Sequence, residues 1–241
     1  MKKIAVITSV YNGEQFITEC IKSVESAVTG QDFSVEHTVI DNGSTDGTTA
    51  ILARHTSARF KKLKADKTLS VSAARNKAIG NTDADYIFCL DADDILLQNA
   101  LATLFAAMLK HQSEWVYGDF LRVDERLSYL TNQDYYGYQF ETARDMLTSI
   151  FKGEHFFQQN SMYSKKLFNL VGGFDEHMDV CEDLDMVIRF LLKGYNAVYV
   201  PSALYLHRFH ADNVSKTSGK ENNMKAHQKD IEALRIKYHQ Q

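Results

Sequence analysis

Three aspartates at the end of an apolar run are the residues whose types and spacing could do chemistry. Asp91, Asp93 and Asp94 follow the apolar residues 86–90. One of them could cap the helix that follows, since aspartate suits an N-cap, or all three could lie in a solvated turn. They could also bind a divalent cation, because carboxylate oxygens suit Mg²⁺ or Mn²⁺, and such ions share their coordination sphere with substrate phosphates.

The elements that must position these aspartates alternate along the first half of the chain. The residue patterns predict strands at 4–10, 35–40, 59–63 and 86–90, and helices at 14–28, 48–55, 72–79 and 101–109. This alternation is typical of an α/β fold with a mostly parallel, Rossmann-like sheet, in which ligands sit beyond the carboxyl ends of the strands. The polar stretches SVYNGE, DNGSTDG and DADD each follow a strand, so we expect them at one edge of the sheet.

The second half of the chain is less regular. We predict a strand at 115–123, helices at 143–151, 165–171 and 183–193, and short strands at 196–200 and 204–209. Residues 124–142 are polar and rich in tyrosine, which indicates a loop or hairpin. Neither a linker nor an internal repeat divides the sequence, so one continuous domain is predicted.

Composition excludes several classes of protein. A net charge of −4 and a pI near 6.1 argue against nucleic-acid binding, which usually needs a basic domain. Cys20, Cys89 and Cys181 lie far apart, which indicates reduced, buried thiols. The apolar run at the N-terminus is too short for a signal peptide, and no run is long enough to span a membrane, so we expect a cytoplasmic protein.

Six motifs occur in an order that resembles the inverting nucleotide-sugar glycosyltransferases of family 2, which have a GT-A fold. They are SVYN at 9–12, IDNGSTDGT at 40–48, AARNKAI at 73–79, LDADD at 90–94, VGGFDE at 171–176 followed by Glu182–Asp183, and RFH at 208–210 followed by Asn213 and Ser215. The resemblance covers residues 3 to about 215. It implies a nucleotide-binding half at 1–112 and an acceptor-binding half at 113–215.

The resemblance implies that the first two loops hold the nucleoside. Tyr11 would lie against the base, and Asp41 and Asn42 would meet the base and its sugar. The family has aspartate where this chain has Asn42, and an amide donates as well as accepts hydrogen bonds. This departure bears on the family's usual base preference. UDP remains the first choice, with GDP and dTDP as alternatives. The remaining nucleotide-binding residues would be Ser9, Val10, Arg75 on the diphosphate, Asp91 and Ala92.

The resemblance also implies the metal site and the catalytic base. Asp93 would bind Mn²⁺ or Mg²⁺, and His210, beside Arg208, would either complete the metal or diphosphate contacts or have a structural role. Asp183, next to Glu182, would act as general base and take a proton from the acceptor hydroxyl as that oxygen attacks the anomeric carbon. Acidic residues in a first helical turn are also common for structural reasons.

The expected function is therefore metal-dependent sugar transfer to a sugar or lipid-linked sugar acceptor, in bacterial cell-surface polysaccharide synthesis. A non-catalytic nucleotide-sugar-binding protein is an alternative. A sugar-phosphate nucleotidyltransferase would need a glycine-rich basic loop after the first strand, whereas SVYNGEQF has one glycine and no cation. A dinucleotide oxidoreductase would need G-x-G-x-x-G, which the sequence lacks.

The C-terminal tail, residues 216–241, carries a helical stripe of apolar residues. The stripe consists of Met224, Ile231, Leu234 and Tyr238. Packing on the domain, homodimer formation and docking on the inner face of an anionic membrane are the three interpretations of this stripe.

Overall fold

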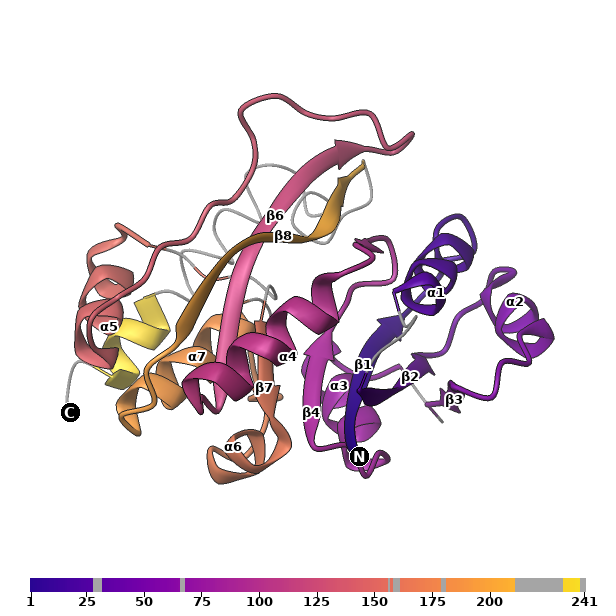
Figure 1. The fold of residues 1–241 in the computed structure, drawn as a ribbon. Helices are drawn as coiled ribbons and strands as arrows, with labels where there is room; N and C mark the ends of the chain where they lie inside the picture. The colour runs from indigo at the N-terminus through magenta and orange to yellow at the C-terminus, as the bar shows by residue number, and fades with distance from the viewer. Residues whose placement is uncertain are drawn as a thin grey trace.

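A mixed sheet of eight strands forms the centre of the structure, which is a computed structural model (Figure 1). The structure describes residues 1–27, 32–65, 68–155, 157, 161–178, 181–210 and 232–238. Within them the strand order is β3-β2-β1-β4-β7-β6-β8-β5. The strands are β1 (Lys2–Val10), β2 (Phe33–Asp41), β3 (Phe60–Lys64), β4 (Tyr86–Cys89), β5 (Ile95–Leu96), β6 (Trp115–Asp124), β7 (Ser161–Ser164) and β8 (Val198–Phe209).

Four strands of the first half, β1 to β4, are parallel, as their alternation with helices predicts. β1 pairs with β2 and with β4, and β2 pairs with β3. Their carboxyl ends therefore meet at one edge, where Val10 lies opposite Asp41 in the ladder. The predicted placement of the three polar stretches at this edge is confirmed.

The second half departs from the predicted strands in two ways. β7, which was not predicted, joins β4 to β6 by antiparallel pairing. The two short strands predicted on either side of Pro201 are wrong, because β8 is a single strand. Its register against β6 shifts where Gly118 pairs with Val200 and Asp119 pairs with Ala203, so Pro201 lies in a bulge. Proline cannot donate to the ladder, and a bulge accommodates it.

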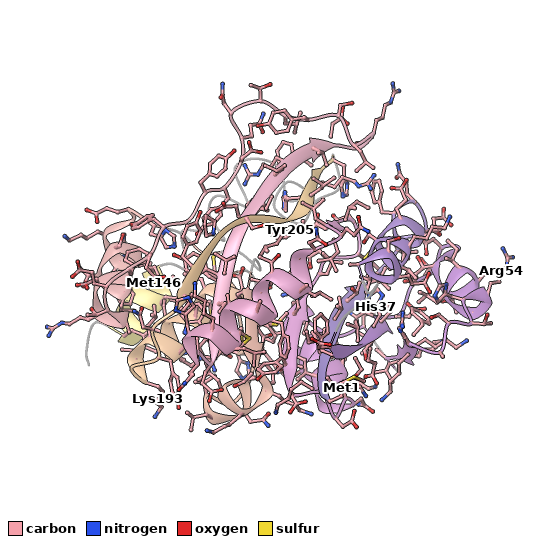
Figure 2. All side chains as sticks on the ribbon, viewed as in Figure 1. Met1, His37, Arg54, Met146, Lys193 and Tyr205 are labelled. Carbon is pink, nitrogen blue, oxygen red and sulfur yellow. The ribbon has the colours of Figure 1, made fainter. Side chains whose placement is uncertain are left out.

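Helices cover both faces of the sheet, because successive strand residues point to opposite faces. The helices are α1 (Ile17–Ser26), α2 (Thr48–Arg54), α3 (Val71–Gly80), α4 (Ala100–His111), α5 (Ala143–Lys152), α6 (Lys165–Leu170) and α7 (Glu182–Leu192). Apolar residues of α1, α2 and α4 join one buried cluster, and those of α3, α5, α6 and α7 join the other. Figure 2 shows His37 and Tyr205 in the interior and Arg54 at the rim. The chain thus forms the single α/β domain that was predicted.

Residues 232–238 form a helix, here named the C-terminal helix, which packs on the domain near α5 and α7 (Figure 1). Leu234 and Tyr238 are buried in the same apolar cluster as α7. Packing on the domain therefore accounts for these two residues of the apolar stripe. Met224 and Ile231, like Asn213 and Ser215 of the last motif, lie outside the described residues.

The three cysteines are buried, as predicted, and burial raises the pKa of the Cys89 thiol to about 11. Among the helices that the structure describes, none combines the length and the apolar character that crossing a bilayer requires.

Candidate active site

Arg75 on α3 joins two parts of the chain that are far apart in sequence. Its side chain is nearly fully buried, and its Nη2 donates to Asp91 Oδ1 at 2.8 Å while its Nη1 donates to Glu182 Oε1 at 2.5 Å. Ser70 caps α3, because its hydroxyl accepts a hydrogen bond from the N–H of Ala73. Through its contacts with Asp91 and Glu182, Arg75 bridges the loop after β4 and the first turn of α7.

Asp183 lies next to this bridge and is half-buried. One of its oxygens accepts a hydrogen bond from the N–H of Leu184 at 2.7 Å. Burial, together with the neighbouring charge of Glu182, raises the pKa of Asp183 to about 7, although Arg75 opposes the shift. A carboxylate with this pKa can accept a proton near neutral pH, as a general base must.

The three aspartates after β4 lie close enough to share a cation. One oxygen from each of Asp91, Asp93 and Asp94 lies within 4.8 Å of the others. Burial raises the pKa of Asp91, against the effect of Arg75, and burial beside the other aspartates raises that of Asp94 well above its usual range. Crowded carboxylates of this kind fit Mn²⁺ or Mg²⁺. The N-cap of α4 is Asn99, so the prediction that one of the three aspartates caps this helix is wrong.

Arg208, near the end of β8, braces the same aspartates. Its backbone N–H donates to Asp94 Oδ1 at 2.9 Å, and its Nε donates to the carbonyl of Asp93 at 2.8 Å. Its Nη2 donates to Glu19 at 2.6 Å. His210 Nε2 lies 2.8 Å from Asp93 Oδ2, so His210 is beside the candidate metal ligand.

Glu19 was not predicted to belong to the site. It lies in the first turn of α1, and its partner Arg208 is 189 residues away in sequence. A surface carboxylate on an amphipathic helix gives no sequence signal for such a pairing, because helical periodicity identifies only the buried face.

The loops after β1 and β2 are joined by hydrogen bonds. Asn12 Oδ1 accepts from the N–H of Thr45 at 2.8 Å, and the N–H of Asn12 donates to Ser44 Oγ at 3.0 Å. The carboxylate of Glu14 accepts from the N–H of Gly47 at 2.6 Å. These contacts, here named the loop clasp, make the two loops one wall of the site.

Ser9, Val10, Tyr11 and Ala92 lie at the carboxyl edge of the sheet. Ser9 and Ala92 are half-buried, and Val10 is buried. Tyr11 is 55% exposed directly after β1, so its ring is accessible to a planar ligand.

Asp41 and Asn42 are buried and already engaged with the protein. Asp41 accepts from the N–H of Ser44 at 2.9 Å and from the hydroxyl of Thr49 at 2.5 Å. The amide group of Asn42 donates to the carbonyl of Leu69 and accepts from its N–H, both at 2.9 Å. The structure brings both residues to the predicted edge and uses their side chains to shape its wall.

Residues 171–176, here named the glycine turn, are attached to α3 through Asn76. The side chain of Asn76 accepts from the N–H of Phe174 and donates to its carbonyl, both at 2.9 Å. Gly172 and Gly173 have φ values of +85° and +79°, a backbone conformation that favours glycine in a tight turn. Asn76 was not predicted as a site residue, although it follows Arg75 directly.

Comparisons with known proteins agree with this geometry. The family described as Glycosyl transferase family 2 matches residues 5–172. Chondroitin synthase of Escherichia coli is 28% identical over 243 residues, which cover 97% of this chain and 33% of the synthase.

Two solved structures share the fold. S. aureus TarS 1-349 in complex with UDP-GlcNAc gives a TM-score of 0.72 at 20% identity, covering 88% of this chain and 60% of that chain. The mannosyltransferase PcManGT from Pyrobaculum calidifontis, in complex with GDP-Man and Mn²⁺, gives 0.64 at 18% identity, covering 85% and 56%. The chain therefore spans a third of the synthase and less than two thirds of either solved chain.

Proposed function

This chain belongs to glycosyl transferase family 2 and has the GT-A fold, and on that premise we propose that it transfers a sugar from a nucleotide-sugar donor to an acceptor hydroxyl with inversion. The Arg75 bridge carries the proposal. It sets a buried guanidinium, which suits a diphosphate, beside the carboxylate of Asp183, which suits a base.

In the proposed reaction, Asp183 takes the proton of the acceptor hydroxyl. The acceptor oxygen bonds to the anomeric carbon while the bond from that carbon to the diphosphate oxygen breaks. Arg75 stabilises the negative charge on the departing nucleoside diphosphate. One displacement of this kind inverts the anomeric centre. The pKa of about 7 supports Asp183 as the base, because its ionised form is well populated near neutral pH.

We propose that Asp91, Asp93, Asp94 and His210 would hold Mn²⁺ or Mg²⁺. Their oxygen-rich donor set and the raised pKa values of Asp91 and Asp94 support this assignment. A bound divalent cation would supply positive charge to the diphosphate leaving group. The mannosyltransferase PcManGT, which shares the fold, contains Mn²⁺.

The donor we favour is a UDP-sugar, with Ser9, Val10, Tyr11, Asp41, Asn42 and Ala92 around the nucleoside. TarS in complex with UDP-GlcNAc supports the uracil base, whereas PcManGT with GDP-Man keeps GDP as an alternative. Because Leu69 engages both amide atoms of Asn42, we assign this side chain to shaping the nucleoside wall. The relationship to a chondroitin synthase supports a role in bacterial polysaccharide synthesis. The acceptor we propose is a sugar or lipid-linked sugar.

A thermal-shift screen tests the proposal. UDP, GDP, dTDP and their sugar conjugates are added with and without Mn²⁺. A ligand present at 100 times its Kd stabilises the folded state by about 2.7 kcal/mol, so we expect UDP with Mn²⁺ to raise the Tm by several degrees.

Asp93→Ala should remove the dependence of UDP binding on Mn²⁺, and Asp83→Asn, a change at an exposed carboxylate, is the matched control. The absence of a shift with every nucleotide would contradict the proposal. Nucleotide-sugar binding without transfer to any acceptor would favour the non-catalytic alternative.

A further inference from the structure

Asp185 is a fully buried carboxylate in the first turn of α7, two residues after Asp183. Its Oδ2 accepts from Arg189 Nε at 2.8 Å and from Arg189 Nη2 at 2.6 Å. Its Oδ1 accepts from Lys237 Nζ at 3.0 Å and from the hydroxyl of Tyr238 at 2.8 Å. A buried carboxylate depends on such donors, because they replace the water that it loses. The C-terminal helix therefore supplies two of the four side-chain hydrogen bonds described here to the carboxylate of Asp185.

Lys237 also contacts the glycine turn. Its Nζ donates to Asp175 Oδ2 at 2.9 Å, so one ammonium group joins the glycine turn to α7. Arg189 adds a second connection, since its Nη1 donates to the carbonyl of Val171 at 2.6 Å. The glycine turn is in turn held by Asn76, the neighbour of Arg75 on α3. A continuous set of polar contacts thus links the C-terminal helix to both sides of the candidate active site.

The contacts of the C-terminal helix combine apolar and charged groups. Leu234 and Tyr238 are buried in the core cluster that also contains Leu184 of α7. The match to the family ends at residue 172, before α7 and the C-terminal helix begin.

We propose that the C-terminal helix is a clamp that positions the catalytic base. Lys237 and Tyr238 act through Asp185 to fix the first turn of α7, and so hold Asp183 at a set distance from Arg75. They are positioning residues. This inference rests on the proposed function, because it takes Asp183 to be the base. A displacement of about 1 Å in a reacting group can reduce turnover by roughly a hundredfold.

Hydrogen exchange tests the clamp without any substrate. In the double variant Lys237→Met/Tyr238→Phe, amide exchange in residues 182–186 should accelerate roughly tenfold or more, because the turn opens locally. Arg235→Met is the matched control, because it removes a cation from the same helix whose ion pair, with Glu232 at 3.7 Å, lies within that helix. Exchange in the control should match that of the original protein.

Kinetics then separate positioning from general stability. At a temperature where every variant is folded, the double variant should lose roughly tenfold to a hundredfold in kcat, while the KM for the donor and the affinity for UDP stay within about twofold. The single variant Lys237→Arg keeps a cation that can reach the carboxylates of Asp175 and Asp185, so it should retain most of kcat. Should the double variant fail to fold, Tyr238→Phe alone, which removes a single hydroxyl, serves for both measurements.

The two arms have distinct outcomes. Unchanged exchange in residues 182–186 overturns the clamp whether or not a donor has been found. Faster exchange with unchanged kcat also overturns it, because the turn would then not position the base. Absence of transfer by the original protein, with faster exchange in the variant, overturns the proposed function and with it the assignment of Asp183 as the positioned base.

Discussion

Arg75 and Asp183 form the electrostatic centre of the candidate site. Arg75 is buried between the carboxylates of Asp91 and Glu182, which fix the position of its guanidinium. Burial and the neighbouring charge of Glu182 raise the pKa of Asp183. Two acidic residues adjacent in sequence therefore have different environments. Glu182 pairs with Arg75, whereas the raised pKa of Asp183 suits proton exchange near neutral pH.

The change Asp183→Asn tests the base directly. An amide cannot take the proton of an acceptor hydroxyl, so the rate of transfer should fall by roughly 10²–10⁴-fold. UDP affinity should persist, since Asp183 is not among the residues assigned to the nucleotide. Initial rates and calorimetric titration measure the two quantities. Near-normal turnover in the variant would show that another group is the base.

The pH dependence follows from the same residue. Since the base acts in its ionised form, kcat/KM should rise with pH through about 7 in the free enzyme. The folded protein holds a proton on Asp183 between about pH 4 and 7, where an unfolded aspartate is ionised. Stability relative to Asp183→Asn should therefore fall as pH rises through this window. Chemical denaturation of both proteins at pH 5 and pH 8 measures it; a constant difference would contradict the pKa shift.

At the scale of elements, sequence patterns do not show how the glycine turn is connected to α3. Its attachment to α3 depends on a close approach of backbone to the side chain of Asn76. A Cβ on Gly173 would lie 2.9 Å from Asn76 Oδ1, whereas a Cβ on Gly172 would meet nothing within 4 Å. The two glycines share a positive φ and differ in the space around them.

Gly173→Ala should therefore destabilise the protein more than Gly172→Ala. Both alanines are strained at positive φ, at a cost of roughly 1–3 kcal/mol, and only the first must also displace Asn76. Urea unfolding of the two variants measures the difference. Equal losses of unfolding free energy would show that Asn76 accommodates the methyl group.

Sequence patterns predicted the four parallel strands of the first half because apolar or β-branched residues recur in each of them and helical patterns lie between them. β7 was missed since SMYS is short and contains two serines, and its pairing with β4 is a long-range contact. The same limit applies to Asn42, whose residue type was visible but whose contact with Leu69 was not. Hydrophobic periodicity indicates which residues of an element are buried, whereas strand-pairing and hydrogen-bond partners far apart in sequence depend on the tertiary fold.

At the scale of the whole molecule, the described part of the tail belongs to the domain. Leu234 and Tyr238 are buried, and Lys237 and Arg235 contact α7, the glycine turn and α5. The described residues of the tail should therefore contribute to the stability of the domain.

Removing residues 232–241 should lower the Tm by roughly 8–16 °C. Two buried side chains contribute about 2 kcal/mol each, and 1 kcal/mol corresponds to about 2–4 °C in a protein of this size. Differential scanning calorimetry of the shortened and full chains measures the change, with Leu234→Ala as a milder comparison. An unchanged Tm would mean that the C-terminal helix is only loosely attached.

The loop clasp between Asn12 and residues 44–45 has a consequence for evolution and engineering. Because each loop supplies hydrogen-bond partners to the other, substitutions in the two loops should be non-additive. A change of base preference made by grafting one loop from a relative would leave the other loop with unmatched donors and acceptors. The two loops depend on each other for hydrogen bonds, so a successful graft would have to carry both.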